Sequence, residues 1–171
     1  MLGVVVLAAA GWGYLRMRQP SNMQAMKDEV RRKFPTVPQL STKELAEWLA
    51  DAKRPAPLLL DARTEAEYDV SHLKGAQRIN AADVDSLELP KDRPVVVYCS
   101  VGYRSSSLAA KLQQRDSSAK VFNLEGSIFE WANEHRPIYK GETEAHEVHP
   151  YNDKWGQLLD PALRAKVQPV E

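Results

Sequence analysis

One short segment combines a thiol, an arginine and several hydroxyl groups where a strand is expected to lead into a helix. The apolar run at 95–98 ends at Cys99, the only cysteine in the chain, and Arg104 follows after four intervening residues. A loop that leads into a helix directs free backbone N–H groups and positive dipole toward its first residues. Both stabilise a thiolate, which is the reactive form of cysteine. We therefore interpret the segment as a cysteine nucleophile in a cradle for anions.

Three further residues give this interpretation its detail. Gly102 allows the tight backbone path that a cradle requires. Arg104 supplies a fixed cation whose planar fork of donors suits an oxyanion. Ser105 is expected to cap the following helix by accepting an N–H bond from its first turn. The alternative is that Cys99 is a small hydrophobic core residue, which is common for a lone cysteine at the end of a buried strand.

The composition narrows the function classes. The chain has 171 residues, with 23 lysines and arginines against 23 aspartates and glutamates. This length favours one domain with appendages, and the zero net charge gives no reason to expect a nucleic-acid partner. A single cysteine excludes an intramolecular disulfide and a cysteine-based zinc cluster. His146 and His149 lack a third ligand nearby in the sequence, so we predict no metal site and no cofactor.

The N-terminal segment, residues 1–20, is expected to be a hydrophobic anchor. Residues 2–15 carry no charge, and Arg16 and Arg18 follow at once. Fourteen helical residues span about 21 Å, which is shorter than a hydrocarbon core of roughly 30 Å. Because the cations lie only on the C-terminal side, the sequence favours a membrane anchor with the rest of the chain in the cytoplasm. Export through a signal peptide and a buried soluble helix are the alternatives.

Residues 21–36 are expected to form an amphipathic helical linker. Apolar residues recur there at helical spacing, at positions 23, 26, 30 and 34, with charged residues between them. A second helix is expected to begin at the capping box Ser41 to Glu44 and to present Leu45, Trp48 and Leu49 as its apolar face.

Short apolar runs alternate with helical pieces through residues 37–142, which we predict to be the main domain. The runs lie at 58–60, 78–80, 94–98 and 121–124, and helical patterns lie at 64–68 and 108–114. Thr64, with Glu67 three positions on, is expected to cap the first of these helical patterns. This alternation predicts an α/β fold with a parallel sheet flanked by helices on both faces. Sites in such sheets lie at the carboxyl ends of strands, where both Cys99 and Asp61 are expected.

Residues 143–171 are expected to form a C-terminal extension that packs on the domain. A short helix is predicted to begin at Asp160, with Pro161 at its first position. The apolar residues expected to attach the extension to the domain are Tyr151, Trp155, Leu158 and Leu159.

Four segments in order resemble signatures of the rhodanese family of sulfurtransferases. They are the run 58–68 with its aspartate, arginine, glutamate and tyrosine, the histidine-to-glycine-alanine turn at 71–76, the loop 99–105, and Leu124-Glu125-Gly126 together with Trp131. The resemblance covers roughly residues 37–139 and implies a rhodanese-like parallel sheet.

The resemblance also implies a mechanism through a cysteine persulfide. Cys99 would take a sulfane sulfur from thiosulfate or a persulfide and pass it to cyanide, a thiol or a protein thiol, without a cofactor. Ser100, Val101 and Tyr103 would shape access to the thiol. Val101 and Tyr103 are neutral where some members that use thiosulfate carry extra cations, which disfavours thiosulfate as the physiological donor.

Asp61 and Arg63 are expected to support the site instead of reacting. In the family they look structural, with Asp61 near the loop and Arg63 able to pair with Glu65 or Glu67. Ion-pair networks of this kind often resemble active sites. His72 is likewise expected to be a partly buried turn residue and not a general base.

Two other functions remain open at this point. Cysteine phosphatases and arsenate reductases also use a loop that runs from a cysteine to an arginine, but phosphatase loops place five residues between them where this chain has four. A tetrahedral phosphate also requires a general acid, and no candidate is identifiable in the sequence. Some rhodanese domains are non-catalytic binding modules, usually after loss of the cysteine that this chain retains. The oligomeric state is not predicted.

Overall fold

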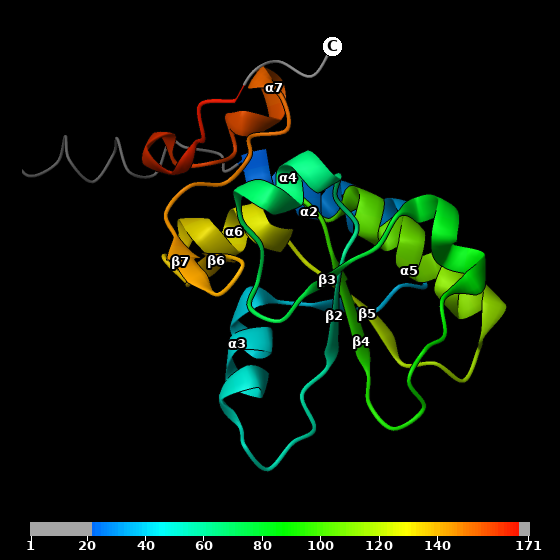
Figure 1. Cartoon of the computed structure of the whole chain (residues 1–171). Coiled ribbons are helices and arrows are strands. Elements are labelled where there is room, and N and C mark those ends of the chain that lie inside the picture. The colour runs from blue at the N-terminus through cyan, green and yellow to red at the C-terminus, as the bar shows by residue number, and fades with distance from the viewer. Residues whose placement is uncertain (1–21, 168–171) are drawn as a thin grey trace, which may run out of the picture.

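The computed structural model describes residues 22–167 and has a five-stranded parallel sheet at its centre (Figure 1). The strand order is β1-β5-β4-β2-β3, with every neighbouring pair parallel. The strands are β1 (Gln39–Leu40), β2 (Leu58–Asp61), β3 (Gln77–Arg78), β4 (Val95–Tyr98) and β5 (Val121–Leu124). The apolar runs expected to be strands therefore form the sheet, and β1 joins them as a strand the sequence did not reveal.

Helices cover both faces of the sheet, as predicted. Alternate residues of β4 point to opposite faces because side chains alternate along a strand. Val95 and Val97 pack in a core with α5 (Tyr103–Arg115), whereas Val96 and Tyr98 pack in a second core with residues of the other helices. Those helices are α2 (Asn22–Lys33), α3 (Thr42–Ala50) and α6 (Ser127–Asn133).

Local capping signals begin two of the helices where the sequence placed them. Ser41 accepts an N–H bond from Glu44 at the start of α3. Thr64 and Glu67 form the same reciprocal capping box at the start of α4 (Glu65–Val70). The predicted apolar face of α3 is correct in part, because Leu45 and Trp48 are buried but Leu49 is 42% exposed.

The helix α2 packs against the domain with the face that its periodicity predicts. Met23, Met26 and Val30 are buried in the core that contains α6. On its polar side, the Nζ of Lys27 lies 2.8 Å from a carboxylate oxygen of Glu130. The helix is thus attached to the domain by apolar burial and by an ion pair.

After α6 the polypeptide forms a β-hairpin, which is followed by two short helices. The hairpin consists of β6 (Ile138–Lys140) and β7 (Thr143–Ala145), and it is followed by α7 (Asp153–Gly156) and the 3₁₀ helix η2 (Pro161–Leu163), which Asp160 caps as predicted. Another 3₁₀ helix, η1 (Ala81–Ser86), follows β3. Val148 and Leu159 of this extension are buried in the core cluster that contains α6. Tyr151 departs from the expectation because it is 42% exposed.

The expected hydrophobic anchor, residues 1–20, lies outside the described residues. Within residues 22–167, no helix has the length and apolar character needed to span a membrane.

Candidate active site

Cys99 lies at the carboxyl end of β4, where the chain turns into α5. The turn ends at Gly102, which has a φ of +100° and caps α5 without a side-chain bond. A Cβ at Gly102 would lie 3.3 Å from Nδ2 of Asn123, so both the backbone conformation and the space favour glycine. The helix therefore begins at Tyr103, earlier than the predicted 108–114, and the prediction that Ser105 caps it is wrong.

The sulfur of Cys99 is buried and receives a backbone donor. The Gly102 N–H donates to Sγ at 3.2 Å. The hydroxyl of Ser105 lies 3.4 Å from Sγ and 2.6 Å from Oδ1 of Asn123. Because a serine hydroxyl has one proton, and the contact with Asn123 is the shorter, Ser105 donates to Asn123 and leaves an oxygen facing the thiol. Asn123 in turn donates to Gln39 at 2.7 Å.

The start of α6 holds the same loop from the other side. The N–H groups of Ile128 and Phe129 donate to the carbonyls of Cys99 and Ser100 at 3.2 and 3.1 Å. The hydroxyl of Ser127 accepts from the Cys99 N–H at 3.2 Å. The thiol is thereby positioned by backbone bonds to two helices, with the positive end of the 13-residue helix α5 beside it.

Arg104 ties the loop to α4. Its guanidinium donates to both carboxylate oxygens of Glu67, at 2.8 and 2.7 Å, and to the hydroxyl of Ser100 at 2.9 Å. Ser100 also donates to Glu67 at 2.9 Å. The planar fork of Arg104 was expected to suit an oxyanion, and in the structure its two terminal nitrogens donate to the carboxylate of Glu67.

The electrostatics of this pair follow from its partial burial. Burial alone would raise the pKa of the Glu67 carboxyl, but the hydrogen bonds and charge of Arg104, together with Thr64 and Ser100, outweigh it and lower the pKa to about 2. Burial also opposes the charge of Arg104, and its bonds to Glu67 and the nearby Cys99 outweigh that effect and raise its pKa. The pair is therefore ionised at neutral pH.

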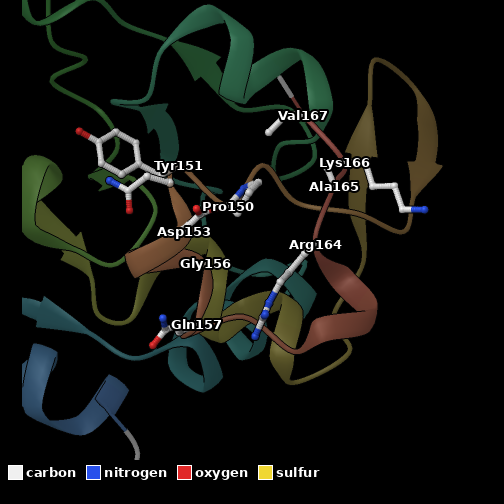
Figure 2. Close-up of a pocket in the computed structure, with 10 residues that line it drawn as sticks. Pro150, Tyr151, Asp153, Gly156, Gln157, Arg164, Ala165, Lys166 and Val167 are labelled. Carbon is white, nitrogen blue, oxygen red and sulfur yellow. The ribbon is translucent and has the colours of Figure 1, made fainter. Parts of the chain in front are cut away.

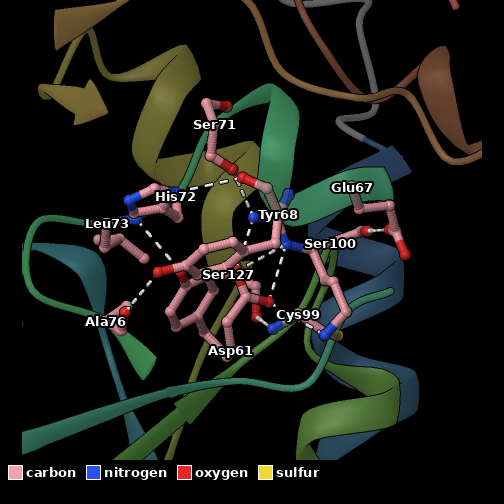
Figure 3. A network of polar contacts seen from close by, with 12 residues as sticks. Asp61, Glu67, Tyr68, Ser71, His72, Leu73, Ala76, Cys99, Ser100 and Ser127 are labelled. Carbon is pink, nitrogen blue, oxygen red and sulfur yellow. Dashed lines mark hydrogen bonds and ion pairs between the residues drawn. The ribbon is translucent and has the colours of Figure 1, made fainter. Parts of the chain in front are cut away.

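Asp61 and Arg63 form a separate buried ion pair next to the site. Arg63 donates to Asp61, with the shortest contact at 2.6 Å, and to the carbonyl of Ser71 at 2.6 Å. This corrects the expected pairing of Arg63 with Glu65 or Glu67. Figure 3 shows Asp61 within a network of polar contacts that includes Tyr68 and His72. His72 was expected to be a partly buried turn residue, but it is buried, its backbone forms a bridge with Tyr139, and its ring stacks on Tyr68 with centroids 4.0 Å apart.

A pocket of about 150 Å³ opens onto the thiol. Its lining combines the loop with the C-terminal extension, and consists of Cys99, Ser100, Val101, Tyr103, Arg104, Tyr151 and Trp155. Most of the predicted loop residues therefore line the pocket, whereas Gly102, Ser105, Asp61 and Arg63 lie outside its lining. In the described part of the chain, no group of three or more potential metal ligands occurs.

Several residues of the site were not predicted as such. Glu67 was identified as a helix cap but not as the partner of Arg104, and Asn123, Ser127, Tyr151 and Trp155 were not assigned to the site. The capping pattern at Thr64 to Glu67 was the one local signal that fixed the position of a site carboxylate. The other contacts join residues far apart in the chain.

Comparisons with known proteins agree with this geometry. The profile of the Rhodanese-like domain family matches residues 41–134, which is more than half of the chain. The chain is 35% identical over 102 residues to a probable adenylyltransferase/sulfurtransferase, MoeZ, of Mycobacterium tuberculosis. That match spans 57% of this chain and 25% of the relative.

The matches with two further proteins span a larger share of those proteins. A sulfurtransferase of Allochromatium vinosum is 36% identical over 104 residues, spanning 60% of this chain and 94% of that protein. The solution structure of the rhodanese-like domain of an Anabaena protein superposes with a TM-score of 0.53 and 28% identity, and covers 60% of this chain and 78% of that one. The family match over residues 41–134 includes β2, α4, β4 and α5.

Proposed function

The chain belongs to the rhodanese-like domain family, and on this premise we propose that it is a sulfurtransferase that carries sulfur as a persulfide on Cys99. Relatives described as sulfurtransferases support the general class. The observation that carries the residue assignment is the buried sulfur of Cys99, which accepts from Gly102 beside a helix N-terminus and faces an open pocket.

The proposed reaction has two displacement steps. The Cys99 thiolate attacks the sulfane sulfur of thiosulfate or of a persulfide. A new S–S bond forms, and the donor S–S bond breaks as sulfite or a thiolate leaves with the electron pair. A nucleophile such as cyanide or a thiol then attacks the outer sulfur, and the Cys99 thiolate leaves. The Gly102 N–H and the α5 N-terminus stabilise the sulfur anion at the start and end of the cycle.

The Arg104 contacts argue against a phosphatase. A phosphate-binding loop directs arginine donors to the substrate oxygens, whereas here both terminal nitrogens of Arg104 already bind Glu67. The Gly102 N–H that donates to the Cys99 sulfur, together with the pocket at the thiol, likewise favours catalysis over a purely binding role.

A turnover assay separates these functions. Parent protein and Cys99→Ser are incubated with thiosulfate or glutathione persulfide and with cyanide, and thiocyanate is measured, while an aryl phosphate is tested in parallel. We expect thiocyanate from the parent and none above background from Cys99→Ser, because the chain has no second thiol. Cys99-dependent hydrolysis of the aryl phosphate without thiocyanate would favour the phosphatase.

We also propose that residues 2–15 hold the domain at the cytoplasmic face of a membrane. The uncharged run followed by Arg16 and Arg18 supports this. Fractionation of the full chain, with protease protection, tests it against a variant that lacks residues 1–20. Recovery of the full chain in the soluble fraction, or its export after cleavage, would contradict the anchor and leave the sulfur chemistry untouched.

A further inference from the structure

The C-terminal extension supplies two aromatic side chains to the pocket at the thiol. Tyr151 and Trp155 line it together with the active-site loop. Their segment is fixed independently of that loop, because Val148 and Leu159 are buried and Asn133 bonds to both the Leu158 carbonyl and the Asp160 N–H at 2.8 Å. The aromatic side of the pocket is therefore a fixed wall.

Tyr151 adopts a conformation that tyrosine rarely adopts. Its φ is +65°, in the left-handed region that is uncommon for residues other than glycine. The buried ring of His149 holds this turn, since its Nδ1 accepts from the Tyr151 N–H at 2.9 Å. Tyr151 also lines a larger cavity of about 540 Å³ within the extension. Figure 2 shows its ring extending away from Ala165 and Lys166. The ring instead lies 4.8 Å from Cζ of Arg104.

The pocket offers little positive charge to offset the hydration that a small dianion would lose on binding. Arg104 is the one charged residue in its described lining, and Glu67 neutralises that charge. Lys33 and Lys154 lie 5.2 and 5.7 Å from the ring centroids of Tyr103 and Trp155, but both lysines are exposed and their charges are screened by water. A thiosulfate dianion would have to lose water against mostly apolar and aromatic surface.

From this arrangement we propose that Tyr151 and Trp155 are specificity-determining residues that favour persulfides of small organic thiols over thiosulfate as sulfur donors. The inference rests on the proposed function of Cys99. The carbon next to the persulfide sulfur contacts the aromatic wall, and the sulfur atoms themselves make favourable contacts with aromatic rings. A thiosulfate sulfonate gains nothing comparable from the same rings.

The test measures how fast Cys99 takes up sulfur from each donor in a single turnover. Glutathione persulfide and thiosulfate are compared for the parent, Tyr151→Ala, Trp155→Ala, Tyr151→Phe and, as a control, Gln157→Ala. Gln157 is an exposed residue of the same extension outside this pocket. Thermal melting verifies that each variant is folded. The Tyr151 variants are expected to fold because this side chain is 42% exposed.

We expect the parent to react faster with glutathione persulfide than with thiosulfate. Each alanine variant should lose about tenfold in persulfide loading, the effect of a lost apolar contact in a pocket, and change less than about twofold with thiosulfate. Tyr151→Phe keeps the ring and should match the parent, as should Gln157→Ala.

Three outcomes would overturn the inference. A parent that prefers thiosulfate, or folded alanine variants that slow both donors equally or neither, would contradict the aromatic wall while leaving sulfur transfer intact. A parent that takes sulfur from neither donor would contradict the proposed function, and the inference with it.

Discussion

The ion pair between Glu67 and Arg104 should contribute measurably to stability, and Glu67→Gln tests its charge with little change in shape. Glutamine keeps an oxygen that can accept from the Thr64 N–H, so the capping bond at the start of α4 is retained in kind. What the substitution removes is the negative charge that faces Arg104 at 2.7 and 2.8 Å.

The magnitude follows from the pKa of Glu67. Folding lowers it from 4.5 to about 2, although burial acts in the opposite direction. Since a tenfold change in acidity corresponds to about 1.4 kcal/mol, the ionised form is favoured in the folded state by about 3 kcal/mol. The side chain of Arg104 is 33% exposed, so its charge can regain some hydration when Glu67 is replaced. The expected loss in the free energy of unfolding therefore lies at the lower end of about 3–5 kcal/mol, the range for breaking a buried ion pair.

Urea unfolding at a series of pH values measures this contribution. Because the folded pKa is lowered, the stabilisation is present above pH 4.5 and is lost as the pH falls toward 2. At pH 7 we expect Glu67→Gln to lower the free energy of unfolding by about 3 kcal/mol. The difference from the parent should shrink as the pH falls through that window. Glu65→Gln, an exposed residue of the same helical turn, is the matched control and should behave as the parent.

Two results would refute the reasoning. One is an unchanged free energy of unfolding for Glu67→Gln at pH 7. The other is a large difference that persists undiminished at the lowest pH, which would assign the effect to packing and not to charge.

Three further predictions concern residues around the thiol. Gly102→Ala places a side chain at a φ of +100° against Asn123, and it should lower the free energy of unfolding by about 1–3 kcal/mol in urea titrations and slow sulfur transfer. Arg104→Lys keeps the charge but loses the two-pronged contact, so kcat/KM for sulfur transfer should fall about tenfold while Tm changes little; parent-like kinetics would contradict the tethering role. Burial, aided by nearby arginines, lowers the pKa of His149 below 6.5, so the extension should lose stability as the pH falls from 6.5 toward that lowered value. His149→Gln should remove this dependence, as followed by the pH profiles of melting and of persulfide loading, and an unchanged profile would show that His149 does not hold Tyr151.

The parts of the fold that the sequence predicted depend on local patterns. The β-branched run before Cys99 indicates a buried strand, and the capping boxes at Ser41 and Thr64 fix the starts of two helices within a few residues. The strand β1 has two residues and β6 and β7 have three each, which is too short for an alternating pattern. Their positions depend on pairing with distant chain, which the sequence does not display.

The candidate site divides in the same way. Cys99 and Gly102 could be recognised because both lie in one continuous turn. The partner of Arg104 could not, because Glu67 lies 37 residues earlier and is brought close only by the sheet. Ser105 was misplaced because its spacing suits a cap, whereas the positive φ of Gly102 starts the helix three residues sooner. The contribution of Tyr151 depends on how the extension folds back, which no local pattern specifies.

The central claim is that Cys99 carries the transferred sulfur, and intact-mass analysis tests it most directly. The protein is incubated with glutathione persulfide or thiosulfate, freed of donor, measured, and measured again after addition of cyanide. The account predicts that the parent gains one sulfur atom, located on Cys99 by peptide mapping, and loses it to cyanide, whereas Cys99→Ser gains none. A parent protein whose mass is unchanged by both donors, or a Cys99→Ser variant that still forms thiocyanate, would contradict it.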